Sequence, residues 1–176
     1  MRNLTKVASL ALLASALLVP AVPASATAVA DDPFSVFKVS VKVAKTAKAG
    51  GKLNYTIVAT NTGPYEANAY FLGGQFPKDV DLRKIYYRSS VKGTECGLEG
   101  RALYCLVPKV LKKDESIAMI FETKLKKTAK GTETATLGVI SYDLQTGMED
   151  MSKEELERLG VPEHGYAKTV KTKIVR

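Results

Sequence analysis

The sequence predicts an all-β fold in which two antiparallel sheets pack face to face, and three features of the chain support this prediction. Apolar and polar residues alternate with the two-residue period of a strand in several short segments. Clusters of Gly, Pro and Asn separate these segments at intervals of about ten residues, which is typical of a sandwich. Only one segment carries the start and stop signals of a helix.

The first segment, residues 1–26, has the pattern of a cleaved secretory signal peptide. A basic start precedes an apolar run over 7–19, and the small residues Ala24-Ser25-Ala26 follow it. The run is shorter than the roughly 20 residues that a membrane-spanning helix needs. We therefore expect cleavage after Ala26, no membrane span in the remaining chain and an extracellular location, with cell-wall association as a further option.

Residues 27–35 are expected to form a flexible leader, and residues 36–176 a single sandwich domain. The leader contains Asp31-Asp32-Pro33 and lacks an alternating pattern. The chain that remains after the signal peptide has the usual length of one domain, so one hydrophobic core is expected.

The first half of this domain predicts four strands. The first two alternate apolar and polar residues on either side of Gly50-Gly51. The third contains Gly73-Gly74, which indicates a bulge or the close approach of another backbone. The fourth has a weaker pattern around Ile85 and Tyr87. In chain order, these strands are expected at 36–44, 53–61, 67–76 and 82–91.

The second half predicts a hairpin, three further strands and one short helix. Ser152 and Glu155 have the spacing of a capping box, and Gly160 with Pro162 ends the helix after about two turns. The helix therefore lies in the loop before the last strand. The strands are expected at 103–107 within the hairpin, and then at 117–125, 132–142 and 170–174.

The chain has two cysteines, Cys96 and Cys105, which we expect to pair. Gly97 and Gly100 lie between them and permit a tight turn, so two short antiparallel strands would bring the sulfur atoms together. A redox pair is the alternative, but the Cys-x-x-Cys spacing that tunes thiolate reactivity is absent.

Residues 52–64, with the sequence KLNYTIVATNTGP, resemble the DUF11 family of bacterial surface domains. The resemblance covers about 37–142 and includes Phe76-Pro77, both cysteines and the strand over 116–125. It implies an immunoglobulin-like sandwich with a structural or adhesive role and no known catalysis. The chain departs from the family pattern at 74–77 and 113–114. It also has one copy of a domain that often occurs in tandem.

The formal net charge is +8 for the full sequence and about +6 without the basic residues Arg2 and Lys6 of the expected signal peptide, which makes anionic partners plausible. Most of the basic residues are lysine, whereas nucleic-acid sites favour the forked guanidinium of arginine, so no nucleic-acid partner is expected. Alternate lysines on the first and last strands predict a basic stripe that could bind an anionic polymer of the cell envelope. Protection of sheet edges against aggregation is the competing interpretation, which the lack of arginine favours. The stripe consists of Lys38, Lys42, Lys171 and Lys173.

The sequence contains no recognisable catalytic site, metal site or cofactor site, so we expect that the protein is not an enzyme. The single histidine, His164, is expected in a solvated loop, and no Gly-x-Ser-x-Gly turn presents a nucleophile. Asp143, Glu149 and Asp150 lack the ligand spacing of a calcium loop.

We expect a partner surface at one end of the sandwich. In immunoglobulin-like sandwiches, the loop after the second strand and the loop before the last strand lie at the same end, where such folds usually bind. The surface would consist of Pro64, Tyr65, His164 and Tyr166. The expected function is that of a secreted, non-catalytic interaction or structural module whose partner is an envelope polymer or an extracellular protein. The alternative is a secreted inhibitor that presents Arg101 of the hairpin to an extracellular enzyme such as a protease.

Overall fold

A computed structural model describes residues 34–144, 147–148 and 151–175. The expected signal peptide and residues 27–33 of the expected leader lie outside the described residues. The last two residues of that leader belong to the fold instead. Ser35 is buried and pairs with Pro64 at the start of the first strand, and the Phe34 carbonyl oxygen accepts a hydrogen bond from the chain beyond Pro64.

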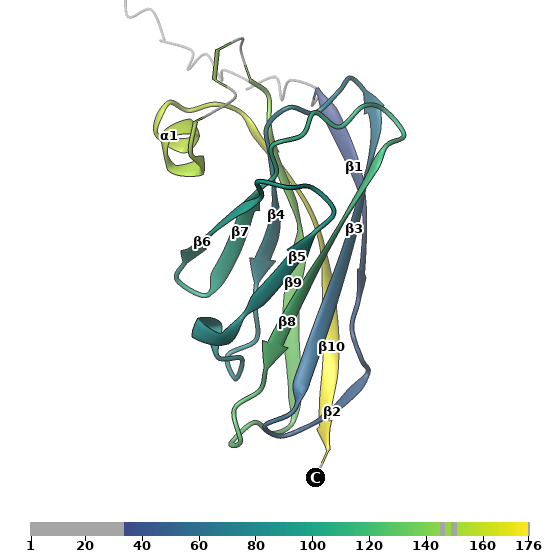
Figure 1. Ribbon diagram of the computed structural model, residues 1–176, viewed down its shortest axis with the longest axis vertical. Helices are drawn as coiled ribbons and strands as arrows, with labels where there is room; N and C mark the ends of the chain where they lie inside the picture. The colour runs from purple at the N-terminus through teal and green to yellow at the C-terminus, as the bar shows by residue number, and fades with distance from the viewer. Residues whose placement is uncertain (1–33, 145–146, 149–150, 176) are drawn as a thin grey trace, which may run out of the picture. The chain divides into compact units, whose positions relative to one another are not determined.

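The described residues form a β-sandwich of two sheets (Figure 1). Neighbouring strands are antiparallel, except that β2 and β10 run parallel. In spatial order, the four-stranded sheet consists of β1 (Ser35–Lys42), β3 (Lys52–Pro64), β8 (Ser116–Lys124) and β5 (Tyr86–Ser89). The six-stranded sheet consists of β2 (Thr46–Lys48), β10 (Glu163–Val175), β9 (Thr132–Tyr142), β4 (Tyr70–Gln75), β7 (Ala102–Leu106) and β6 (Glu95–Glu99).

This strand order confirms the immunoglobulin-like prediction. The order β1-β3-β8-β5 corresponds to strands A-B-E-D of an immunoglobulin-type sandwich, and β10-β9-β4 corresponds to G-F-C. The β6–β7 hairpin extends the second sheet beyond β4. The strand expected at 36–44 is confirmed as β1. The short strand β2 was not predicted, and the chain crosses from one sheet to the other between β1 and β2.

Strand alternation places every second side chain of the central strands between the sheets. Leu53 and Tyr55 of β3 are 1% exposed, and Met119 and Phe121 of β8 are fully buried. The Phe76 ring packs edge to face against two of these residues, with its centroid 5.5 Å from that of Tyr55 and 5.3 Å from that of Phe121. This core holds the strands from which the loops at both ends emerge.

The paired glycines of β4 mark a close backbone approach, one of the two outcomes expected for them. The register of β4 with β7 and β9 is regular. A Cβ atom on Gly73, whose φ is 150°, would lie 1.8 Å from the Leu103 carbonyl oxygen. No larger residue fits at this position.

The prediction for the last strand is wrong at its start, because β10 begins at Glu163 and not at 170. It pairs with β9 from Glu163 to Lys173, so His164 and Tyr166 lie on a strand and not in a loop. Gly165 and Ala167 occupy the outward positions here, and their lack of polar side chains removes the alternating pattern from the sequence.

Two other expected strands are shorter than predicted. The segment expected at 82–91 begins with a 3₁₀ turn, Leu82–Lys84, because the Asp81 side chain accepts a hydrogen bond from the Arg83 N–H. The segment expected at 67–76 is extended as a ladder only over β4, and Ala67 makes an isolated bridge.

The predicted helix is confirmed as α1 (Lys153–Arg158), and it begins with the predicted capping box. The Glu155 carboxylate accepts a hydrogen bond from the Ser152 backbone N–H at 3.0 Å, and this bond lowers the pKa of Glu155. Leu156 is fully buried and packs on the outer face of the six-stranded sheet, against Ala69, Phe71 and Tyr142. The helix thus covers part of this face.

Candidate binding surface

Two exposed aromatic rings lie together at the end of the sandwich where β3 ends. Tyr65 follows Pro64, the last residue of β3, and its backbone N–H donates to the Phe34 carbonyl at 3.0 Å. The centroids of the Phe34 and Tyr65 rings are 5.5 Å apart. Their exposures of 55% and 61% leave both rings largely in water. Exposed aromatic side chains on ordered backbone are typical of contact surfaces.

Asn61 holds the turn that carries Tyr65. It is fully buried, and its amide nitrogen donates to the Tyr65 carbonyl at 2.8 Å and to the Leu111 carbonyl at 2.9 Å. Its side-chain oxygen accepts a hydrogen bond from the Gly63 N–H at 2.9 Å. The amide therefore connects the turn after β3 to the loop before β8.

A hollow of about 190 Å³ opens beside the two aromatic rings. It is bounded by the start of β1, by the turn at 65–68 and by Tyr142 and Leu144. Sites for small molecules usually measure about 300–1,000 Å³. The hollow is smaller than that and is suited to one side chain of a protein partner.

His164 is half-buried on β10, so its expected place in a solvated loop is wrong. Its Nε2 lies 2.9 Å from Oδ2 of Asp143, and Oδ1 of Asp143 accepts a hydrogen bond from the Phe34 N–H at 3.1 Å. A His–Asp pair supports nucleophilic catalysis when a hydroxyl or thiol lies beside the imidazole. Within the described ranges, no such group is hydrogen-bonded to His164. The observed contacts position the backbone that carries the Phe34 ring.

Tyr166 lies at the same end as Tyr65, as predicted, but its side chain faces into the fold. Its hydroxyl donates to the Ser35 carbonyl at 3.0 Å, and its ring centroid is 5.8 Å from that of Phe37. Burial raises the pKa of the Tyr166 hydroxyl, and the Asp143 carboxylate raises it further. The four predicted surface residues thus lie at the same end of the sandwich. Pro64 and Tyr65 are exposed there, whereas His164 and Tyr166 are half-buried on β10.

A buried lysine that was not among the predicted site residues anchors α1. Lys153 is 8% exposed, its Nζ lies 3.1 Å from Glu99 and also bonds to Glu157, and it lies 5.1 Å above the Tyr104 ring centroid. Desolvation alone would lower the pKa of Lys153, but the two carboxylates outweigh it and the pKa is raised. The spacing of Lys153 and Glu157 was the available signal.

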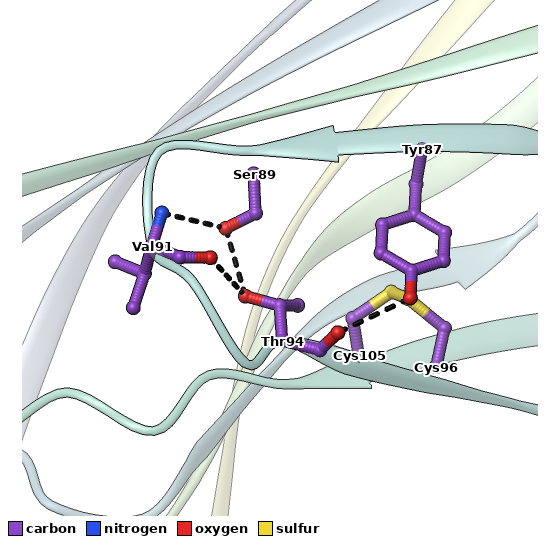
Figure 2. Close-up of a disulfide and its surroundings, with 6 residues drawn as sticks. All are labelled: Tyr87, Ser89, Val91, Thr94, Cys96 and Cys105. Atoms are coloured by element: carbon purple, nitrogen blue, oxygen red, sulfur yellow. Dashed lines mark hydrogen bonds between the residues drawn. A yellow bond between two sulfur atoms is a disulfide. The ribbon is translucent and has the colours of Figure 1, made fainter.

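Cys96 and Cys105 form the predicted disulfide, which joins directly paired residues of β6 and β7 (Figure 2). Near it, the Tyr87 hydroxyl of β5 donates to the Thr94 carbonyl at 3.1 Å, and the Thr94 hydroxyl donates to Ser89 at 2.9 Å. These bonds connect the start of the hairpin to the edge of the four-stranded sheet.

Arg101, at the tip of the hairpin, turns back into the fold. Its guanidinium donates to the carbonyls of Pro77 and Val80, the second at 3.2 Å, and its own carbonyl accepts from the Phe76 N–H. An inhibitory loop must offer its side chain to the enzyme. The observed contacts give no support to Arg101 in that role.

The four lysines of the predicted stripe are exposed, and β1 and β10 lie side by side. They project from different layers, however. Lys38 and Lys42 alternate with inward residues of the four-stranded sheet, whereas Lys171 and Lys173 alternate with inward residues of the six-stranded sheet. Polymer binding by this stripe stays a prediction.

In the part of the chain that the structure describes, no group of three or more His, Cys, Asp or Glu residues is placed to hold a metal ion. None of the described helices is long and apolar enough to cross a membrane.

No known protein-family model matches the chain, and no curated protein matches it, so the DUF11 resemblance stays a prediction. Among solved structures, the chain is similar to a cohesin module of the family 33 glycoside hydrolase of Clostridium perfringens. The identity is 13% and the TM-score 0.47, and the alignment covers 80% of this chain and 97% of that one.

A non-cellulosomal cohesin of Archaeoglobus fulgidus is 13% identical with a TM-score of 0.42, over 60% of this chain and 78% of that one. AvmM, which catalyses macrocyclization in alchivemycin A biosynthesis, is 12% identical with a TM-score of 0.46, over 82% of this chain and 90% of that one. At these scores the similarities carry no argument about function.

Proposed function

We propose that the chain is a secreted, non-catalytic interaction module that binds an extracellular protein through Phe34, Pro64 and Tyr65. The exposed aromatic pair beside a hollow of about 190 Å³ carries this proposal. Aromatic anchors, and side chains that enter small pockets, contribute most of the affinity of protein interfaces. The hollow accepts one partner side chain, while the Phe34 and Tyr65 rings cover it from the side.

The backbone under these rings is already ordered, which favours tight binding. Asn61 fixes the Tyr65 carbonyl, and Asp143 fixes the Phe34 N–H. A surface that is ordered before it binds loses less conformational entropy on association.

Two features support secretion. Residues 1–26 have a signal-peptide pattern. The Cys96–Cys105 disulfide is typical of oxidising compartments, since cytosolic thiols are kept reduced.

The contacts of His164 support a non-catalytic role. The second carboxylate oxygen of its partner Asp143 accepts a hydrogen bond from the Phe34 N–H. The His164–Asp143 pair therefore positions the backbone that presents the aromatic surface.

Co-sedimentation with isolated cell envelopes of the producing organism tests the proposal. Purified protein should sediment with the envelopes at low and at high salt. The Phe34→Ala/Tyr65→Ala variant should lose the salt-resistant fraction. Leu98→Ala removes an apolar side chain of similar exposure, 53%, on the distant hairpin, and should bind like the wild type. Protease treatment of the envelopes should abolish the salt-resistant binding. Unchanged binding by the double variant would refute the proposed surface.

A further inference from the structure

The end of the sandwich where β10 finishes is also the end where β3 begins (Figure 1). Exposed lysines gather on the strands and loops of this end, whereas Tyr65 follows the last residue of β3. The loops around β2 and after β8 build this end. The Gly50 N–H donates to the Lys126 carbonyl at 3.0 Å, and the Lys173 N–H donates to the Lys45 carbonyl at 2.9 Å. We define the basic end by its exposed lysines Lys45, Lys48, Lys52, Lys124, Lys127 and Lys130.

The positive charge of the basic end is not neutralised within the described part of the chain. None of its six lysines forms an ion pair there. Of the acidic residues that approach it, Asp79 lies 4.0 Å from the Lys126 ammonium, Glu122 is paired with Arg88 at 2.7 Å, and Glu133 is only 3% exposed. Charges interact over about 8 Å at physiological ionic strength. Lysines on adjoining strands and loops therefore add to one positive field.

Edge protection does not explain Lys52 and Lys124. Lys52 lies directly opposite Lys124, and their strands, β3 and β8, are the two interior strands of the four-stranded sheet. Like charges directly opposite each other destabilise a sheet. An anionic partner that contacts both ammonium groups would offset this repulsion.

A hollow of about 360 Å³ lies beside this lysine pair. Its lining consists of Lys52, Lys84, Lys124, Thr123, Glu122 and Tyr86, which is 71% exposed. Of the three lysines, Lys84 is paired with Asp81 at 3.6 Å, whereas Lys52 and Lys124 form no ion pair among the described residues. Its volume lies within the range of small-ligand sites, unlike that of the hollow beside Tyr65. It combines cationic groups with one aromatic face, so it suits a unit that has both a negative charge and a ring.

We propose that the basic end binds an anionic carbohydrate polymer, with one charged sugar unit in the hollow beside Tyr86. Lysine ammonium groups are point charges without the bidentate geometry that recognises a fixed phosphate, which suits a flexible polymer. Proteins that hold single-stranded nucleic acid stack successive bases on several aromatic rings, whereas Tyr86 stands alone in this hollow. Membrane-surface binding uses an apolar face, which the six lysines do not provide. This proposal goes beyond the proposed function, because it concerns the other end of the sandwich.

Isothermal titration of the purified protein with polygalacturonate at low salt tests this site. Lys48→Gln/Lys127→Gln/Lys130→Gln should weaken binding about tenfold, and added salt should weaken wild-type binding. The matched control Lys92→Gln/Lys112→Gln/Lys113→Gln removes the same charge away from the basic end, and should change affinity less than about twofold. Tyr86→Ala should weaken binding of polygalacturonate but not of inorganic polyphosphate, which has no sugar ring.

Two results would overturn the inference. Equal losses in the two triple variants would show attraction by net charge without a site. Binding of single-stranded DNA, or of phosphatidylglycerol vesicles, more tightly than polygalacturonate would refute the carbohydrate assignment. Circular dichroism confirms that each variant is folded before titration.

Discussion

Replacing Asn61 by alanine should destabilise the fold by about 3 kcal/mol, because this side chain makes three hydrogen bonds to the backbone. The side chain donates to the carbonyls of Tyr65 and Leu111 and accepts from the Gly63 N–H. Of these groups, the Leu111 carbonyl keeps another hydrogen bond, from the Ala67 N–H at 3.0 Å. An internal hydrogen bond contributes about 1 kcal/mol net, and Asn61 is fully buried, so water cannot replace the lost partners without rearrangement. Urea unfolding followed by far-ultraviolet circular dichroism measures the loss, since the chain has no tryptophan.

Two variants make this prediction specific. Asn61→Asp keeps an acceptor for the Gly63 N–H but faces two carbonyl oxygens with a buried carboxylate, so it should be less stable than Asn61→Ala at neutral pH. Asn68→Ala truncates an exposed asparagine near the same turn and should change stability by less than about 0.5 kcal/mol. A loss below about 1 kcal/mol for Asn61→Ala would refute the reasoning.

Three further changes have defined outcomes. Replacing Cys96 and Cys105 together by alanine should lower the free energy of unfolding by about 2.7 kcal/mol, because the disulfide closes a loop of about ten residues and so lowers the entropy of the unfolded chain. Urea unfolding measures this loss, and the reduced wild type should show the same loss. Lys153→Met should lower the free energy of unfolding by about 1–2 kcal/mol and speed amide hydrogen exchange in α1, because Glu99 and Glu157 lose their partner. Unchanged exchange would show that Lys153 does not anchor the helix. Burial raises the pKa of Glu133 in the folded protein above its ordinary 4.5. The contribution of Glu133 to stability is therefore most favourable below pH 4.5 and falls as the pH rises through the folded-state pKa. Glu133→Gln should therefore match the wild type in thermal stability at acid pH and exceed it at pH 7. Equal stability of the two proteins at both pH values would contradict this expectation.

Most strands could be predicted because one face of each is buried and the other is wet. β8 shows this clearly, with Met119 and Phe121 inward and Glu122 outward. The same rule fails for β4, because α1 covers the outward-facing Phe71 and the strand therefore lacks the alternating polar residues that mark an exposed face. It fails for the first half of β10 because the outward positions carry Gly165 and Ala167.

The candidate site could be predicted only in part, because its residues meet through tertiary structure. Tyr65 follows a turn motif and is visible in the sequence. Phe34 belongs to the surface only because β1 pairs with β3, and no local pattern indicates this pairing. The basic end likewise joins Lys48 of β2 and Lys127 of the loop after β8. These segments are far apart in the chain and meet through the hydrogen bond between Gly50 and Lys126.

The aromatic surface and the basic end should bind independently, because β3 separates them. This strand has 13 residues, and at about 3.3 Å per residue it spans roughly 43 Å. Charges are screened within about 8–10 Å in physiological salt, so lysines at one end do not alter the field at the other. Lys48→Gln/Lys127→Gln/Lys130→Gln should therefore leave the salt-resistant envelope binding unchanged, and Phe34→Ala/Tyr65→Ala should leave polygalacturonate affinity unchanged. Loss of both activities in either variant would mean that the two ends form one coupled site.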